Sequence, residues 1–141
     1  MKTTIKKSFY FAFLTFVFAS ISGSSSTFHT EKETKAQINF KKIFHDFGKV
    51  EEGTELSYKF KFKNTGKENL IINSVNAGCG CTGVQLGDKK EYKKEEEGEI
   101  LITLNTQGRF GEIKKSVSVQ TNDLEKPNIE LTFSCEVIEK K

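Results

Sequence analysis

Two cysteines separated by a single glycine are the residues whose types and spacing could do chemistry in this chain. They lie in the stretch Ala77-Gly78-Cys79-Gly80-Cys81-Thr82, whose glycines permit backbone conformations that a Cβ atom would prevent. Such a pair could form a disulfide that exchanges with other thiols, bind a soft metal ion, or attach covalently to a partner. The alternative without chemistry is a tight loop whose sulfurs pack or pair only to hold the chain in shape.

The spacing of the two cysteines bears on two of these chemistries, disulfide formation and metal binding. In an extended strand, the Cα atoms of Cys79 and Cys81 would lie near the top of the roughly 4.4–6.8 Å range of disulfides, so a disulfide requires a kink, which Gly80 permits. As a metal site the pair supplies only two thiolates, which suits Cu(I) better than Zn(II), because Zn(II) normally takes four ligands. We therefore predict no cofactor, and keep redox chemistry or copper binding by Cys79 and Cys81 as the alternative function.

Arg109, the only arginine of the chain, and the pair His45 and Asp46 are the other candidates. In its glycine-rich turn, the Arg109 guanidinium could bind a carboxylate or phosphate of a ligand, or bond to the carbonyl groups of that turn. His45 beside Asp46 resembles a catalytic pair, but no serine or cysteine nucleophile is near in the sequence, so we expect a surface loop pair. No catalytic residue is predicted, and the protein is expected not to be an enzyme unless the two cysteines carry redox activity.

The N-terminal segment has the pattern of a signal peptide. Lys2, Lys6 and Lys7 precede the uncharged apolar run 9–21, which is shorter than the roughly 20 residues that span a bilayer. We predict a signal peptide over 1–23, a flexible polar linker over 24–37 and one folded domain over 38–141, with an uncleaved anchor as the alternative. The mature protein is then periplasmic or extracellular, and touches a membrane only through the signal segment during export.

Charge and cysteine content narrow the function further. The formal net charge is +3, and loss of the three signal lysines leaves 3 − 3, a mature chain near neutrality with lysines and glutamates interleaved. This pattern disfavours nucleic-acid binding, which needs positive charge concentrated on one face. Three cysteines in an exported chain allow one internal disulfide and one remaining thiol. Cys135 lies in an alternating apolar run, so we expect it to fill the core.

The elements that must position these residues are β-strands. Apolar residues alternate with polar ones along Leu56–Lys63, and the same period of two recurs in later segments, separated by glycine and asparagine turns. A change of phase at Asn73-Ser74 predicts a bulge. An antiparallel β-sandwich is favoured over a barrel. Its seven expected strands are Ile38–Val50 (kinked), Leu56–Lys63, Asn69–Asn76, Val84–Leu86, Gly98–Thr106, Lys114–Thr121 and Asn128–Ile138.

From Phe44 to Val137 the chain resembles the exported bacterial family catalogued as domain of unknown function 1573. That family is itself similar to the immunoglobulin-like domains of the ASPM, SPD-2 and Hydin proteins. The charged run Lys89–Glu97 and Cys135 depart from the family pattern. The resemblance implies an immunoglobulin-like fold and export, and no established activity. It is carried by Phe47-Gly48-Lys49-Val50, Glu52-Gly53, Phe60-x-Phe62-x-Asn64-Thr65-Gly66, Cys79-Gly80-Cys81-Thr82, Gly98-Glu99, Asn105-Thr106-x-Gly108-Arg109-x-Gly111 and Asn122-Asp123.

Strands that alternate in direction would bring the special residues to one end. The loop 51–55, the cysteine loop, the turn 108–111 and the C-terminus would lie at the end far from the linker. The function predicted from this placement is an exported, non-catalytic module that binds an unknown protein or envelope component through this end. The predicted binding residues are Cys79, Gly80, Cys81, Thr82 and Arg109.

Overall fold

The computed structural model describes residues 35–140, and the predicted signal peptide and most of the predicted linker lie outside this range. Nine strands follow one another in two sheets, and no helix among the described residues is long and apolar enough to cross a membrane. The strands are β1 (Ile38–Phe40), β2 (Phe44–Glu51), β3 (Glu55–Asn64), β4 (Leu70–Ala77), β5 (Thr82–Leu86), β6 (Glu91–Tyr92), β7 (Glu97–Asn105), β8 (Gly111–Thr121) and β9 (Asn128–Ile138).

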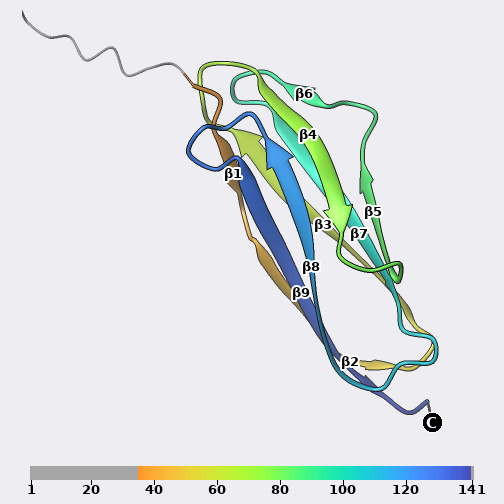
Figure 1. The fold of residues 1–141 in the computed structure, drawn as a ribbon. Coiled ribbons are helices and arrows are strands. Elements are labelled where there is room, and N and C mark those ends of the chain that lie inside the picture. The colour runs from red at the N-terminus through yellow and green to blue at the C-terminus, as the bar shows by residue number, and fades with distance from the viewer. Residues whose placement is uncertain (1–34, 141) are drawn as a thin grey trace, which may run out of the picture. The chain divides into compact units, whose positions relative to one another are not determined.

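The two sheets form an immunoglobulin-like sandwich, as predicted (Figure 1). One sheet has the strand order β1-β3-β7-β5 and the other β2-β9-β8-β4-β6. Since neither sheet closes on itself or joins the other, the barrel alternative does not apply. Their facing sides carry the alternating apolar residues expected from the sequence, and these pack into one core. Its fully buried side chains include Phe60, Phe62, Ile100, Ile102 and Leu104 from the first sheet and Ile72, Val117, Val119, Leu131 and Phe133 from the second.

The first expected strand, Ile38–Val50, is in fact two strands in different sheets. β1 pairs antiparallel with β3, whereas β2 pairs parallel with β9. The inward-facing positions change from even numbers at Ile38 and Phe40 to odd numbers at His45 and Phe47, so the segment between them must break the alternation. The chain uses this break at residues 41–43 to cross from one sheet to the other.

Two other local expectations have opposite outcomes. The predicted bulge is confirmed, because the pairing of β4 with β8 shifts register between Ile72 and Ser74. None of the seven expected strands covers Glu91 and Tyr92 in the charged run Lys89–Glu97, but these two residues form β6 at the edge of the second sheet. Tyr92 is buried against Phe62, with ring centroids 4.9 Å apart. A single aromatic residue among charges has no periodicity, so the alternation gave no signal there.

The packed part of the chain begins before Ile38. Ala36 is buried, and the backbone of Lys35–Gln37 lies so close to Gly66 that a Cβ there would come within 2.1 Å of the Lys35 carbonyl oxygen. Two backbone hydrogen bonds, from Thr65 to Gln37 and from Lys67 to Lys35, hold the segment in place. Residues 35–37 of the expected linker therefore belong to the folded domain.

Candidate functional site

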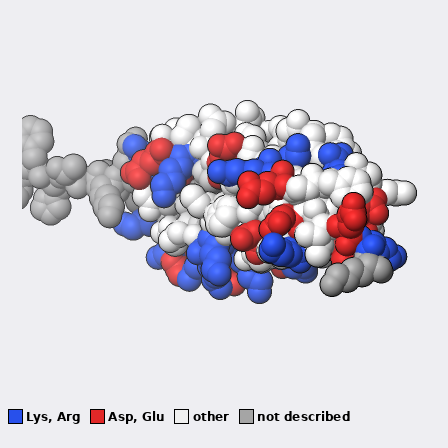
Figure 2. Space-filling model, turned by 90° about the horizontal axis from the view of Figure 1, so that it is seen from below, with Lys and Arg blue, Asp and Glu red and all other residues white. Residues whose placement is uncertain are grey.

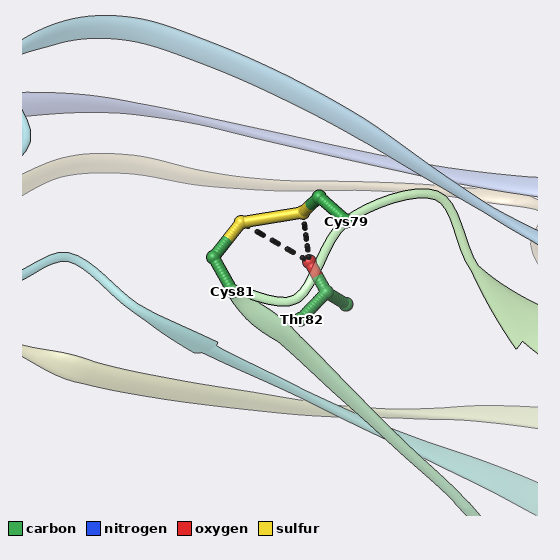
Figure 3. Close-up of a disulfide and its surroundings, with 3 residues drawn as sticks. All are labelled: Cys79, Cys81 and Thr82. Atoms are coloured by element: carbon green, nitrogen blue, oxygen red, sulfur yellow. Dashed lines mark hydrogen bonds between the residues drawn. A yellow bond between two sulfur atoms is a disulfide. The ribbon is translucent and has the colours of Figure 1, made fainter.

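Cys79 and Cys81 form a disulfide in the connection between β4 and β5 (Figure 3). The Thr82 amide donates to the Cys79 carbonyl at 3.3 Å, which closes a four-residue turn over the exposed Gly80. This turn is the kink that the spacing required, and it brings the two Cα atoms to 5.4 Å. Cys135 is the free cysteine of the described chain, and it is buried in the core as expected.

The surroundings of the disulfide are polar on one side. Both cysteines are half-buried, and the hydroxyl oxygen of the buried Thr82 lies 3.4 Å from Cys79 Sγ and 4.0 Å from Cys81 Sγ. Because the sulfurs are bonded to each other, a copper site at this position would first require reduction to two thiolates. Within residues 35–140, no group of three or more His, Cys, Asp or Glu side chains is placed to hold a metal ion.

The β2–β3 and β7–β8 turns are bonded into one rigid tip. Thr106, which is buried, donates its backbone N–H to the Thr54 carbonyl at 3.1 Å and its hydroxyl to the same oxygen at 2.8 Å. The Gly108 amide donates to Glu52 Oε1 at 2.6 Å. Gly108 and Gly111 have φ values of +69° and +79°, which an L side chain rarely adopts, so the turn depends on glycine there.

The half-buried Arg109 and the exposed Phe110 follow Gly108 in this tip. The Arg109 backbone N–H closes the turn by donating to the Thr106 carbonyl at 3.1 Å, whereas its guanidinium has no hydrogen bond or ion pair within residues 35–140. The alternative in which that guanidinium locks its own turn is therefore wrong. Phe110 is 64% exposed. Sequence reasoning missed it as a functional candidate, although an aromatic residue in a glycine turn, outside any alternating strand, was an available signal.

The cysteine loop and the tip lie at the same end of the sandwich, opposite the end where β1 begins (Figure 1). The Asn105 amide, four residues before Arg109, donates to the Cys81 carbonyl at 3.4 Å, so the predicted clustering at one end is confirmed. On the β8 side, however, the start of the cysteine loop is set back from the tip. Gly78 bonds to Ser116, five residues along β8 from Gly111, which corresponds to about 17 Å of strand. No bond between described residues joins Arg109 to the disulfide.

His45 and Asp46 are not a loop pair, because both lie in β2. The His45 ring stacks on Tyr58 with centroids 3.6 Å apart, and burial, together with the positive charge of Lys42, lowers the pKa of His45. Asp46 accepts hydrogen bonds from the Gly48 amide at 3.1 Å and the Ser134 hydroxyl at 2.9 Å, and these lower the pKa of Asp46. Both side chains therefore hold β2 in place, and their contacts differ from those of a catalytic pair.

Charged side chains are distributed over the surface in mixed sign. Lys49 pairs with Glu136 and Lys59 with Glu99, at 3.1 and 2.6 Å, and all four side chains are exposed. Figure 2 shows lysine and acidic residues interspersed over the face that it displays. On that face there is no continuous positive field of the kind that nucleic-acid binding uses.

Residues 38–137 match the family described as "Protein of unknown function (DUF1573)". The chain belongs to this family. No curated protein matches it. Among solved structures, the DUF1573 domain is similar to a protein of unknown function from Porphyromonas gingivalis W83, at 19% identity and a TM-score of 0.65 over 72% of this chain. The match covers 46% of the Porphyromonas chain, so the present chain spans about half its length.

Two further structures have the same fold in other settings. The ASH/PapD-like domain 7 of human CEP192 is 13% identical with a TM-score of 0.57, and the match covers 77% of this chain and 88% of that one. The VesB protease of Vibrio cholerae is 10% identical with a TM-score of 0.55, over 73% of this chain and 31% of VesB. At such identities the likeness establishes the immunoglobulin-like fold of the DUF1573 domain and carries no activity across.

Proposed function

We propose that this DUF1573 protein is an exported, non-catalytic binding module that recognises another protein or an envelope component through the tip formed by the β2–β3 and β7–β8 turns. The observation that carries the proposal is the pairing of an exposed Phe110 with an Arg109 whose guanidinium is free of hydrogen bonds and ion pairs within residues 35–140. Aromatic and arginine side chains supply much of the energy at protein interfaces. A partner with an apolar pocket beside an anionic group matches them.

The rigidity of the tip supports this assignment. The bonds from Thr106 and Gly108 to the β2–β3 turn fix the backbone that carries Arg109 and Phe110 before any partner arrives. A preorganised surface loses less conformational entropy on binding than a mobile loop. Exposure alone is a weaker argument, since Leu124 in the β8–β9 turn is 70% exposed. Leu124 thus provides a matched control.

Export is supported by two independent features. The first 21 residues have the charge and hydropathy pattern of a signal peptide. Cys79 and Cys81 form a disulfide, and disulfides persist in the periplasm and outside the cell rather than in the cytosol. N-terminal sequencing of protein from the periplasmic and membrane fractions tests this part. A mature chain that begins between about residues 20 and 28 is expected, and recovery of Met1 in the membrane fraction would contradict cleavage.

Site-specific photo-crosslinking in living cells tests the binding surface. A photoreactive amino acid replaces Gln107, in the tip next to Gly108, or Glu125, beside Leu124 in the β8–β9 turn. A discrete crosslinked product is expected from position 107, and it should disappear with Arg109→Ala/Phe110→Ala but persist with Leu124→Ala. Equal products from both positions, or a product that survives the double substitution, would contradict the assignment.

Thiol–disulfide exchange is the second candidate, favoured by the half-buried disulfide beside the Thr82 hydroxyl. A partner thiolate would attack Cys81 Sγ, forming a mixed disulfide and releasing Cys79 as a thiolate that the Thr82 hydroxyl can stabilise. A second partner thiol would then displace Cys81, leaving an oxidised partner and a reduced Cys79/Cys81 pair.

Exchange of the folded protein with glutathione, followed by mass spectrometry, measures this activity. If it operates, Thr82→Val should slow release of Cys79, while Thr82→Ser should retain the rate. If the pair is purely structural, both variants should exchange at the same slow rate as the native protein.

A further inference from the structure

Strand β3 has an open edge for part of its length. It pairs with β7 from Glu55 to Lys63, but with β1 only from Phe62 to Asn64, and one further bond joins the Lys41 amide to the Lys61 carbonyl. At that point the chain leaves the first sheet and crosses to β2 in the other. Among the described residues, no strand covers this side of β3 between Glu55 and Lys59.

The register identifies which backbone groups the open edge presents. In an antiparallel ladder, the N–H and C=O of one residue point to the same side, and successive residues alternate sides. The Lys61 carbonyl points toward β1 because Lys41 bonds to it. The N–H and C=O groups of Lys59 and Ser57 therefore point the same way, into the space that β1 has left. They form a pairing template for another strand.

A hollow of about 560 Å³ lies along this edge. Leu101 of β7 and Tyr58 of β3 contribute its apolar lining, and His45 stacks on Tyr58 and so fixes that part of the wall. Ser57 and four lysines complete the lining, and two of these lysines come from the crossover and two from β3. The lysines are Lys41, Lys42, Lys59 and Lys61.

The four lysines are only partly neutralised by their neighbours. Lys41 pairs with Glu97 at 3.4 Å and Lys59 with Glu99 at 2.6 Å, and all four of these side chains are well exposed. Such surface pairs contribute little free energy and can be exchanged for another carboxylate. Lys42 and Lys61 have no ion pair with any residue in the range 35–140. The hollow therefore carries excess positive charge directly beside unpaired backbone groups.

We infer that the open edge of β3 binds an extended acidic peptide segment of another protein, added to the sheet as a strand beside Ser57 and Lys59. Backbone pairing would supply the attachment, and carboxylates at alternate positions of the segment would face Lys59 and Lys61 on the outer side of the sheet. Lysines on an edge also discourage pairing between copies of the same protein. The lysines beside this edge disfavour pairing with neutral or basic strands and favour pairing with an acidic strand. Charge therefore determines which strand binds. This inference is independent of the tip carrying Arg109 and Phe110.

The experiment uses the whole chain as the producing cell processes it, and a fluorescent ten-residue peptide of alternating glutamate and valine. Saturable binding is expected, with none for the lysine–valine counterpart. It should also be absent for an N-methylated glutamate–valine peptide, which keeps the charge but cannot pair. Amide hydrogen exchange should slow at Ser57 and Lys59 when the acidic peptide is bound. Absence of binding, or binding that leaves these two amides unprotected, would overturn the inference.

Matched variants separate backbone pairing from charge. Ser57→Pro removes one outward N–H at an edge position where proline is tolerated, and should weaken binding about fivefold or more, whereas Ser57→Ala should not. Lys42→Glu/Lys61→Glu should weaken binding of the acidic peptide by at least about tenfold. Lys114→Glu/Lys126→Glu reverses two charges outside the hollow and should weaken binding by much less. Equal losses from the two double variants would overturn the inference. So would a dimer that Ser57→Pro dissociates, because the edge would then belong to a second copy of this chain.

Discussion

Two polar side chains at opposite ends of the sandwich, those of Asn64 and Arg109, differ in their hydrogen bonding. At the end where β1 begins, Asn64 is fully buried, and its side chain makes four hydrogen bonds, to Gln37, Gly66, Glu68 and Tyr92. At the other end the guanidinium of Arg109 has no hydrogen bond or ion pair within residues 35–140, and Phe110 stands exposed beside it. Satisfied buried groups stabilise the fold, whereas side chains with no hydrogen bond or ion pair inside the domain are available to a partner. The buried Asn64 network therefore lies at one end of the domain, and the proposed binding tip lies at the other.

Removing Asn64 should have the largest effect on stability. Asn64→Ala deletes these four side-chain hydrogen bonds and leaves the buried Gly66 amide without a partner. We expect the free energy of unfolding in urea to fall by about 3–5 kcal/mol. The control is Asn76→Ala, since Asn76 is exposed and its side chain bonds to Ser74 alone among residues 35–140; this substitution should cost about 0.5 kcal/mol or less. Similar losses for both variants would show that the buried network does not set stability.

The disulfide should contribute a smaller amount. It closes a loop of only three residues, for which chain entropy gives about 1.5 kcal/mol. Cys79→Ser/Cys81→Ser should therefore lower the free energy of unfolding by that amount, and reduction of the native protein should lower it equally. A loss beyond about 3 kcal/mol would show that the turn itself, and not the crosslink, stabilises the end that carries the tip.

Acidification should weaken the attachment of β2 through Asp46. Hydrogen bonds from Gly48 and Ser134 lower the pKa of Asp46 in the folded state below its ordinary value of 3.8. Its stabilising contribution is therefore complete above that ordinary value, and is lost as the pH falls through the lower folded pKa. The unfolding free energy of Asp46→Asn should decline less steeply with acid over this range. Parallel pH profiles of the variant and the native protein would contradict the role of Asp46.

The smallest stability effect is expected at Phe110. Because its side chain is 64% exposed, Phe110→Ala should change the free energy of unfolding by no more than about 0.5 kcal/mol. Leu124→Ala should behave in the same way in thermal unfolding. A loss of about 2 kcal/mol at Phe110 would show that its ring packs on the domain, and would remove the argument that it is held ready for a partner.

Much of the fold was predictable because its signals are local. The alternation along Leu56–Lys63 identified β3, and the phase change at Asn73-Ser74 identified the bulge, since both follow from the two-residue period of a strand. β6 was missed for the same reason, because two residues in a charged run have no period to detect. The Cys79–Gly80–Cys81 pattern correctly required a kink for a disulfide.

The sequence by itself determined most of the strands, their inward faces and the turns, because side-chain alternation and glycine are read within a few residues. Only the tertiary structure decided which strands pair, since pairing joins residues far apart in the chain. Because β1 leaves the sheet at Lys41, the edge of β3 is open. Only the register shows that the backbone groups of Ser57 and Lys59 point outward from this edge. The sequence likewise placed Arg109 and Phe110 in a turn. Bonds from Thr106 and Gly108 to a turn some 50 residues earlier decide that this turn is rigid.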